Sequence, residues 1–145
     1  MMTAALLLAV FSGCDRGAKG GAPRDGARHA AVKGDSGPPP GQLPQGVTAE
    51  QGKEGRRLYR TTCVMCHGDS GEGTQLGPSL VDAEWTQGTG SFEEIIRVVT
   101  NGAPATETFG VPMPVRGNGA LTDAQIRAVS AYTFSLARRS GAAAQ

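Results

Sequence analysis

Two cysteines three positions apart and an adjacent histidine constrain this chain more than any other feature. They form the segment Cys63-Val64-Met65-Cys66-His67. At that spacing each thiol can add to one vinyl group of a haem, and the next imidazole can take the proximal position under the iron. The pattern therefore predicts a c-type haem attachment site, with Cys63 and Cys66 as covalent anchors and His67 as a ligand.

Two other kinds of site also use closely spaced cysteines. A structural zinc site needs two further ligands, and outside the motif the only other thiol and imidazole belong to Cys14 and His29. A thioredoxin-like redox pair follows a strand in a βαβ pattern, whereas the segment before Cys63 has the pattern of a helix. We therefore expect one covalently bound haem c rather than zinc or a redox pair.

The composition is consistent with a small domain built around a buried cofactor. The chain has 145 residues, of which 5% are aromatic and 22 are glycine, so large apolar side chains are scarce for a core. A buried haem would supply the missing apolar volume. The formal net charge is +1, which excludes an electrostatic nucleic-acid binder.

The N-terminus has the pattern of a bacterial export signal. The apolar run Ala4–Gly13 is shorter than the about 20 residues that span a bilayer, but it suits the apolar part of a signal. Small residues then precede Cys14, which resembles the lipobox of bacterial lipoproteins. We expect a signal peptide over 1–13 and lipidation of Cys14; the alternative is an incidental thiol behind an ordinary cleavable signal.

Residues 14–47 have the composition of a flexible tether. From Asp15 to Gly46, eight Gly and five Pro occur and no apolar periodicity is present, which is typical of segments that cannot build a core. A lipid on Cys14 would hold the protein on the periplasmic side of a bacterial membrane without a spanning helix. Without the lipid, the protein would be soluble in the periplasm.

Three helices are predicted in the rest of the chain, each by a capping box. The capping pairs are Thr48 and Gln51, Ser91 and Glu94, and Thr122 and Gln125. The first helix should reach about Thr62, and the second should end at Asn101-Gly102. No alternating strand pattern occurs, so we expect an all-α domain over 48–139, followed by a disordered tail over 140–145.

Over 48–139 the chain resembles the class I cytochromes c. That family has a helix leading into a CxxCH motif, then a Gly-Pro loop, a distal methionine and a closing helix. Cys63, Pro78 and Met113 occur in that order here. The resemblance implies a cytochrome c fold, with three or more helices around a covalently bound haem c.

The resemblance extends to the first and last helices. Gly55 and Tyr59 look like the glycine and aromatic residue of the family's first helix, and Val129 and Tyr132 look like their partners on the last. Only a small residue at a helix crossing allows close approach of the two backbones. We therefore expect Gly55 to lie where these helices cross.

Met113 is the expected second iron ligand. Met1 and Met2 belong to the signal, and Met65 lies between the two haem-binding cysteines. Met113 lies in the loop before the last helix, as the family's distal methionine does, and prolines on both sides restrict its backbone. Without the CxxCH motif, it would be interpreted as a methionine that fills a gap in the core.

The resemblance implies roles for two further residues. The carbonyl of Pro78 would accept a hydrogen bond from the proximal imidazole, which would fix the ring of His67 and increase its basicity; the alternative is a simple turn. Trp85 matches in position a tryptophan that some family members point at a haem propionate. A plain core tryptophan is the alternative there.

Together these expectations predict an electron carrier rather than an enzyme. A His/Met pair raises the reduction potential and leaves no open iron position, so no small-molecule substrate is expected. The expected partners are redox proteins such as a quinol-oxidising complex, a dehydrogenase or a terminal oxidase of an extracytoplasmic respiratory chain. They would dock at an apolar rim formed by Val64, Met65, Val111 and Pro112.

Two alternatives remain for the function. The chain could be the haem c subunit of a membrane-associated dehydrogenase or oxidase complex. It could also be a ligand-binding or peroxidatic haem protein, which requires that Met113 does not bind the iron.

Overall fold

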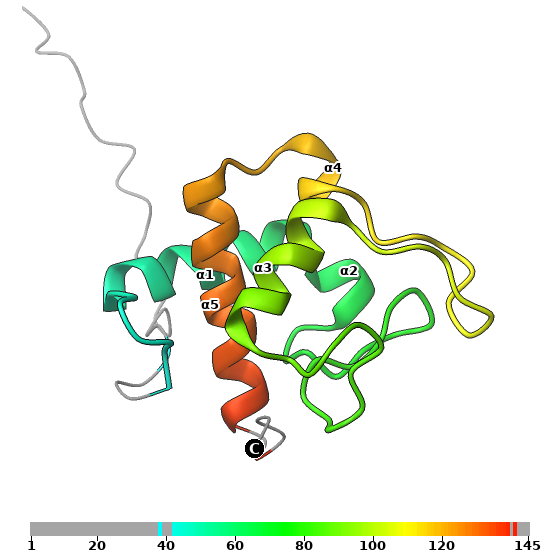
Figure 1. Ribbon diagram of the computed structural model, residues 1–145, viewed down its shortest axis with the longest axis horizontal. Helices are drawn as coiled ribbons and strands as arrows, with labels where there is room; N and C mark the ends of the chain where they lie inside the picture. The colour runs from blue at the N-terminus through cyan, green and yellow to red at the C-terminus, as the bar shows by residue number, and fades with distance from the viewer. Residues whose placement is uncertain (1–37, 39–41, 140, 142–145) are drawn as a thin grey trace, which may run out of the picture. The chain divides into compact units, whose positions relative to one another are not determined.

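The described part of the chain, Pro38, residues 42–139 and Gly141, forms helices joined by loops (Figure 1). The helices of this computed structural model are α1 (Ala49–Thr62), α2 (Val64–His67), α3 (Phe92–Asn101), α4 (Arg116–Gly119) and α5 (Asp123–Arg139). No strand longer than an isolated bridge occurs among these residues, which confirms the predicted all-α class. None of these helices is both long enough and apolar enough to cross a membrane.

The three longer helices begin where their capping boxes predict. At α1, the N–H of Thr48 donates to the side-chain oxygen of Gln51 at 2.8 Å, and the N–H of Gln51 donates to the Thr48 hydroxyl at 3.2 Å. At α3, Glu94 accepts from the N–H of Thr89 and from the hydroxyls of Thr89 and Ser91. These bonds lower the pKa of Glu94 to about 2.

Gly55 lies where α1 crosses α5, as predicted (Figure 1). A Cβ added there would collide with the backbone carbonyl of Ala128 and lie 3.0 Å from the Cβ of Tyr132. Tyr132 is therefore a partner, as expected. Val129 lies buried in the same core cluster as Tyr59 and Tyr132, and the carbonyl of Ala128 is the group nearest to Gly55. Beside the crossing, the rings of Tyr59 and Tyr132 pack edge to face with centroids 5.4 Å apart.

We expect the variant Gly55→Ala to destabilise the haem-bound protein by about 2–3 kcal/mol, because the added methyl meets backbone that cannot move aside. In an open helix the same change would stabilise by up to about 1 kcal/mol. The free energy of unfolding in denaturant measures the difference. Gly110→Ala is the matched control, since its Cβ would meet nothing within 4 Å. A Gly55→Ala protein as stable as the control would contradict the close crossing.

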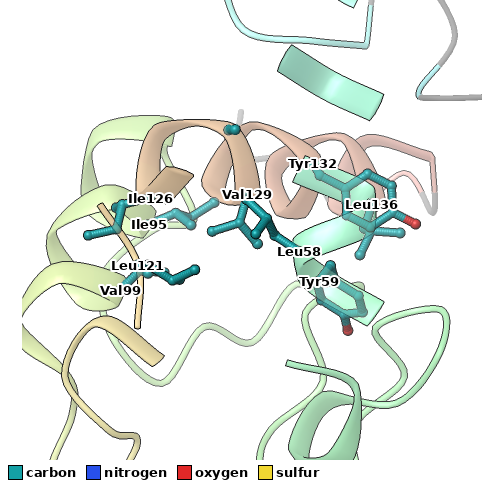
Figure 2. Close-up of a cluster of buried hydrophobic side chains, with 10 residues drawn as sticks. Leu58, Tyr59, Ile95, Val99, Leu121, Ile126, Val129, Tyr132 and Leu136 are labelled. Carbon is teal, nitrogen blue, oxygen red and sulfur yellow. The ribbon is translucent and has the colours of Figure 1, made fainter. Parts of the chain in front are cut away.

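The apolar core packs along α5 (Figure 2). At one end, Ile95 and Val99 of α3 lie near Leu121 and Ile126. At the other end, the α1 residues Leu58 and Tyr59 face Tyr132 and Leu136. The core thus joins the first, middle and last long helices, and it positions the loops between them.

The packed domain begins earlier than the predicted boundary at Thr48. Pro38 and Pro44 are buried, and a Cβ added to Gly52 of α1 would lie 3.0 Å from the side chain of Leu43. The last residues of the predicted tether therefore pack against α1, because Gly52 leaves room for them. The expected signal over 1–13, Cys14, and the tether residues up to 37 and over 39–41 lie outside the described residues, as do residues 140 and 142–145.

Candidate haem site

One cavity is lined by all five residues that were predicted to hold the haem. They are Cys63, Cys66, His67, Pro78 and Met113. The first three come from the end of α1 and from α2, whereas the other two come from separate loops. Much of the remaining wall is apolar and includes Leu80, Ile95, Val98, Val99 and Val129. The fold therefore brings all five selected residues to the same space.

The imidazole of His67 is held in one orientation by the backbone. Its Nδ1 lies 2.9 Å from the carbonyl oxygen of Pro78. Because a carbonyl only accepts, Nδ1 carries the proton and Nε2 keeps a free lone pair. Burial lowers the pKa of His67, against a smaller opposing effect of the Pro78 bond, so the ring stays in the neutral form that binds metals.

The loop that carries Pro78 is pinned directly to the motif. The hydroxyl of Thr74 donates to the carbonyl of Cys66 at 2.8 Å, and the N–H of Thr74 donates to the carbonyl of Gly77 at 3.0 Å. A Cβ on Gly77 would lie 3.2 Å from Cε1 of His67. The glycine before Pro78 therefore permits the close approach that the imidazole bond requires.

The two cysteines of the motif are half-buried, and neither forms a disulfide in the described part of the chain. Burial, and then the neighbouring charge of Cys66, raise the pKa of Cys63 to about 12. Next to them, the hydroxyl of Tyr59 donates to the carbonyl of Gly68 at 2.8 Å. This buried bond, which the sequence analysis did not anticipate, ties α1 to the residue that ends α2.

Met113 reaches the cavity from a narrow hairpin loop, residues 103–113, which is closed by one isolated bridge and drawn in yellow in Figure 1. Its N–H donates to the carbonyl of Ala103 at 2.9 Å, and the reverse bond measures 3.1 Å. Towards the tip of this loop, the N–H of Thr106 donates to the carbonyl of Phe109 at 2.9 Å. The Met113 side chain is half-buried and packs against the core. Backbone pairing as well as proline thus restrains this residue.

The segment labelled α4 is a left-handed turn after Met113 rather than an ordinary α-helix, and periodicity provided no signal for it. Arg116, Gly117, Asn118 and Gly119 all have positive φ, at 50°, 57°, 63° and 77°. A left-handed conformation costs roughly 1–2 kcal/mol for an L-residue with a Cβ, and Arg116 is the least suited of the four. The dipeptide Asn118-Gly119 is a turn signal that could have indicated the position.

The donor set in this cavity fits a haem: it offers two thiols, a free imidazole nitrogen, a thioether and apolar walls. Trp85 also lines the cavity, and among the described residues its buried indole Nε1 has no hydrogen-bond partner. Gly90, at φ 76°, leaves room for the ring, since an added Cβ would collide with it. The indole nitrogen is closed to solvent, so it lies within the wall of the cavity rather than on its open surface.

Comparisons with known proteins identify the family of this chain. Residues 50–132 match the family described as cytochrome C oxidase, cbb3-type, subunit III. The chain is 34% identical over 96 residues to the cbb3-type cytochrome c oxidase subunit CcoP of Azospirillum brasilense, covering 62% of this chain and 32% of that protein. It is 35% identical over 85 residues to the subunit FixP of Sinorhizobium medicae, covering 57% and 29%.

Solved structures similar to the chain include two bacterial cytochromes. Cytochrome CL of Methylophaga aminisulfidivorans is 29% identical with a TM-score of 0.47, over 58% of this chain and 51% of that one. The c-type cytochrome XoxG of Methylobacterium extorquens is 26% identical with a TM-score of 0.44, over 57% and 48%.

The chain spans about a third of the length of the curated relatives that it matches. The family match nevertheless covers more than half of the chain and contains the whole CxxCH motif, Pro78 and Met113. The chain therefore belongs to the family of subunit III of cbb3-type cytochrome c oxidases, and its all-α domain is a cytochrome c domain that carries haem c.

Proposed function

We propose that this domain is a class I monohaem electron carrier, with haem c attached to Cys63 and Cys66 and ligated by His67 and Met113. One observation carries the proposal: Nδ1 of His67 is bound to the Pro78 carbonyl, which leaves Nε2 free in a cavity that Met113 also lines. These side chains would supply the iron with an imidazole and a thioether as its two protein ligands.

The residues around the cavity have roles that suit the transfer of an electron. When bound, the haem supplies the Fe(III)/Fe(II) couple. The thioether of Met113 is a soft donor that favours the reduced state and raises the potential. Pro78 holds the imidazole in place, and the wall of the cavity is largely apolar. Because these side chains are held in fixed positions, they would need to move little when the charge of the iron changes, which suits electron transfer.

Visible spectra of the purified haem-bound protein test this proposal. The oxidised form should show the sulfur-to-iron charge-transfer band of Met113 ligation, and the reduced form should not bind carbon monoxide readily, because both axial positions are occupied. Ready binding of carbon monoxide by the native reduced protein would contradict the His/Met carrier and favour a ligand-binding haem protein.

The docking face proposed for redox partners is the apolar rim formed by Val64, Met65, Val111 and Pro112, of which Val111 and Pro112 also line the cavity. Met65 is 75% exposed and Val111 is 44% exposed, and Pro112 is also exposed. From Thr48 onward, nine basic and ten acidic residues nearly balance, so no net charge of the domain would dominate docking. Apolar contact of limited area suits brief encounters.

A second candidate function places the chain inside a complex. The match to subunit III of cbb3-type oxidases supports a haem c subunit that passes electrons to a terminal oxidase. In that case the catalytic centre would lie on another chain. Purification from native membranes distinguishes the two, because a complex subunit stays with oxidase activity through mild detergent whereas a free carrier separates from it.

We also propose the membrane arrangement that the N-terminus predicts. The signal over 1–13 directs export, Cys14 receives the lipid, and the tether over 14–47 connects that anchor to the domain over 48–139 on the periplasmic side. Haem attachment and export support each other, since covalent attachment in bacterial cytochromes of this kind is extracytoplasmic.

A further inference from the structure

The segment between Met113 and α5 is held by one side chain, that of Arg116. Its Nε donates to the carbonyl oxygen of Leu121 at 3.1 Å, and its Nη2 donates to Oδ1 of Asp123 at 2.6 Å. The N–H of Leu121 in turn donates to the Arg116 carbonyl at 3.1 Å. Three hydrogen bonds therefore close the methionine loop onto the start of α5.

The same turn packs against the helix that leads into the haem motif. A Cβ on Gly117 would lie 2.6 Å from the Thr62 methyl and 3.3 Å from Leu121, and Thr62 immediately precedes Cys63. Gly117 also lines the haem cavity. Any shift of the turn would therefore change the position of the methionine loop relative to the cysteines.

The conformation of the turn depends on these bonds. Arg116 is left-handed at φ 50°, a conformation that a long L-side chain rarely adopts and that persists where the surroundings determine it. Its bond to the part-buried Leu121 carbonyl is the stronger restraint, because Asp123 is 93% exposed and a solvent-exposed ion pair contributes little. Without the guanidinium, the backbone would relax toward an ordinary conformation and carry the loop with it.

We propose that Arg116 is a positioning residue for Met113: by holding the left-handed turn against α1 and α5, it keeps the thioether on the iron. This inference rests on the proposed His/Met ligation. Arg116 does not itself contact the haem in this role; it acts through the loop of which Met113 is part.

The test is competition between Met113 and added imidazole in the oxidised haem-bound protein. Imidazole displaces the thioether, and loss of the sulfur-to-iron band reports the displacement. We expect Arg116→Ala to bind imidazole about tenfold more tightly than the native protein, since a charge-assisted bond that held the loop is lost. Arg116→Lys keeps the positive charge but lacks the planar guanidinium group that donates both bonds. We expect it to bind imidazole about threefold more tightly than the native protein. Asp123→Asn should change the affinity less than either.

The matched control is Arg57→Ala, which removes an exposed ion pair to Glu54 of the same 2.6 Å length on α1. It should leave the imidazole affinity unchanged. If Arg116→Ala binds imidazole as the native protein does, even with a lower melting temperature, the positioning role is overturned while the ligation stands. If the native protein lacks the sulfur-to-iron band, the ligation and the positioning role both fail. If Arg116→Ala yields no folded haem protein, Arg116→Lys decides the test. An affinity of that variant for imidazole equal to that of the native protein would overturn the inference.

Discussion

A double variant with both Cys63 and Cys66 replaced by serine is expected to keep no haem attached to the chain after denaturation. Each thiol supplies one thioether, and the other cysteine, Cys14, lies far from the motif in the sequence. The native chain should therefore stain for haem on a denaturing gel, and the double variant should not. Each single variant should retain one thioether and a weaker stain.

The matched control for this pair is Cys14→Ser. It should keep the haem stain but, if Cys14 is acylated, move the protein from the detergent phase to the aqueous phase in a phase-partition assay. Haem that resists denaturation in the double variant would refute the proposed attachment. An unchanged partition of Cys14→Ser would refute the lipid anchor and leave the haem site as it is.

Met113→Ala is expected to open the iron to external ligands and to lower the reduction potential. Loss of the soft donor removes its preference for the ferrous state. The fall should be on the order of 100 mV or more, within the roughly 0.8 V range that axial ligands span. Potentiometric titration measures the shift, and a carbon monoxide difference spectrum of the reduced protein reports the open position.

Met65→Ala is the control for that experiment, because Met65 lies within the haem motif but is 75% exposed and does not line the cavity. Its spectrum and potential should match those of the native protein. If Met113→Ala also keeps the native spectrum and potential, another residue binds the iron and the His/Met assignment is wrong.

The helices were predictable because their signals are local. A capping box brings together residues three apart, and the predicted starts at Thr48, Ser91 and Thr122 agree with α1, α3 and α5. The four-residue helices α2 and α4 were not predicted, since neither is long enough to show a periodic apolar face. The pairing of Ala103 with Met113 also left no alternating pattern, because only an isolated bridge forms.

Contacts between distant segments were predicted less well than helix starts. The resemblance indicated the crossing at Gly55 and its partner Tyr132, but it did not indicate that the backbone carbonyl of Ala128 lies nearest to that glycine. The packing of Leu43 on Gly52 was likewise missed, since the Gly and Pro content around Leu43 favours disorder.

The sequence by itself determined the chemistry of this protein, because Cys63, Cys66 and His67 are adjacent in the chain and their spacing is what haem attachment requires. Tertiary structure decided how that chemistry is held. Pro78 reaches His67, Met113 reaches the same cavity, and Arg116 ties the methionine loop to α5. These relations join residues far apart in the chain or depend on a left-handed backbone, so they form only when the core packs. The family resemblance indicated the roles of Pro78 and Met113, whereas nothing in the sequence indicated that of Arg116.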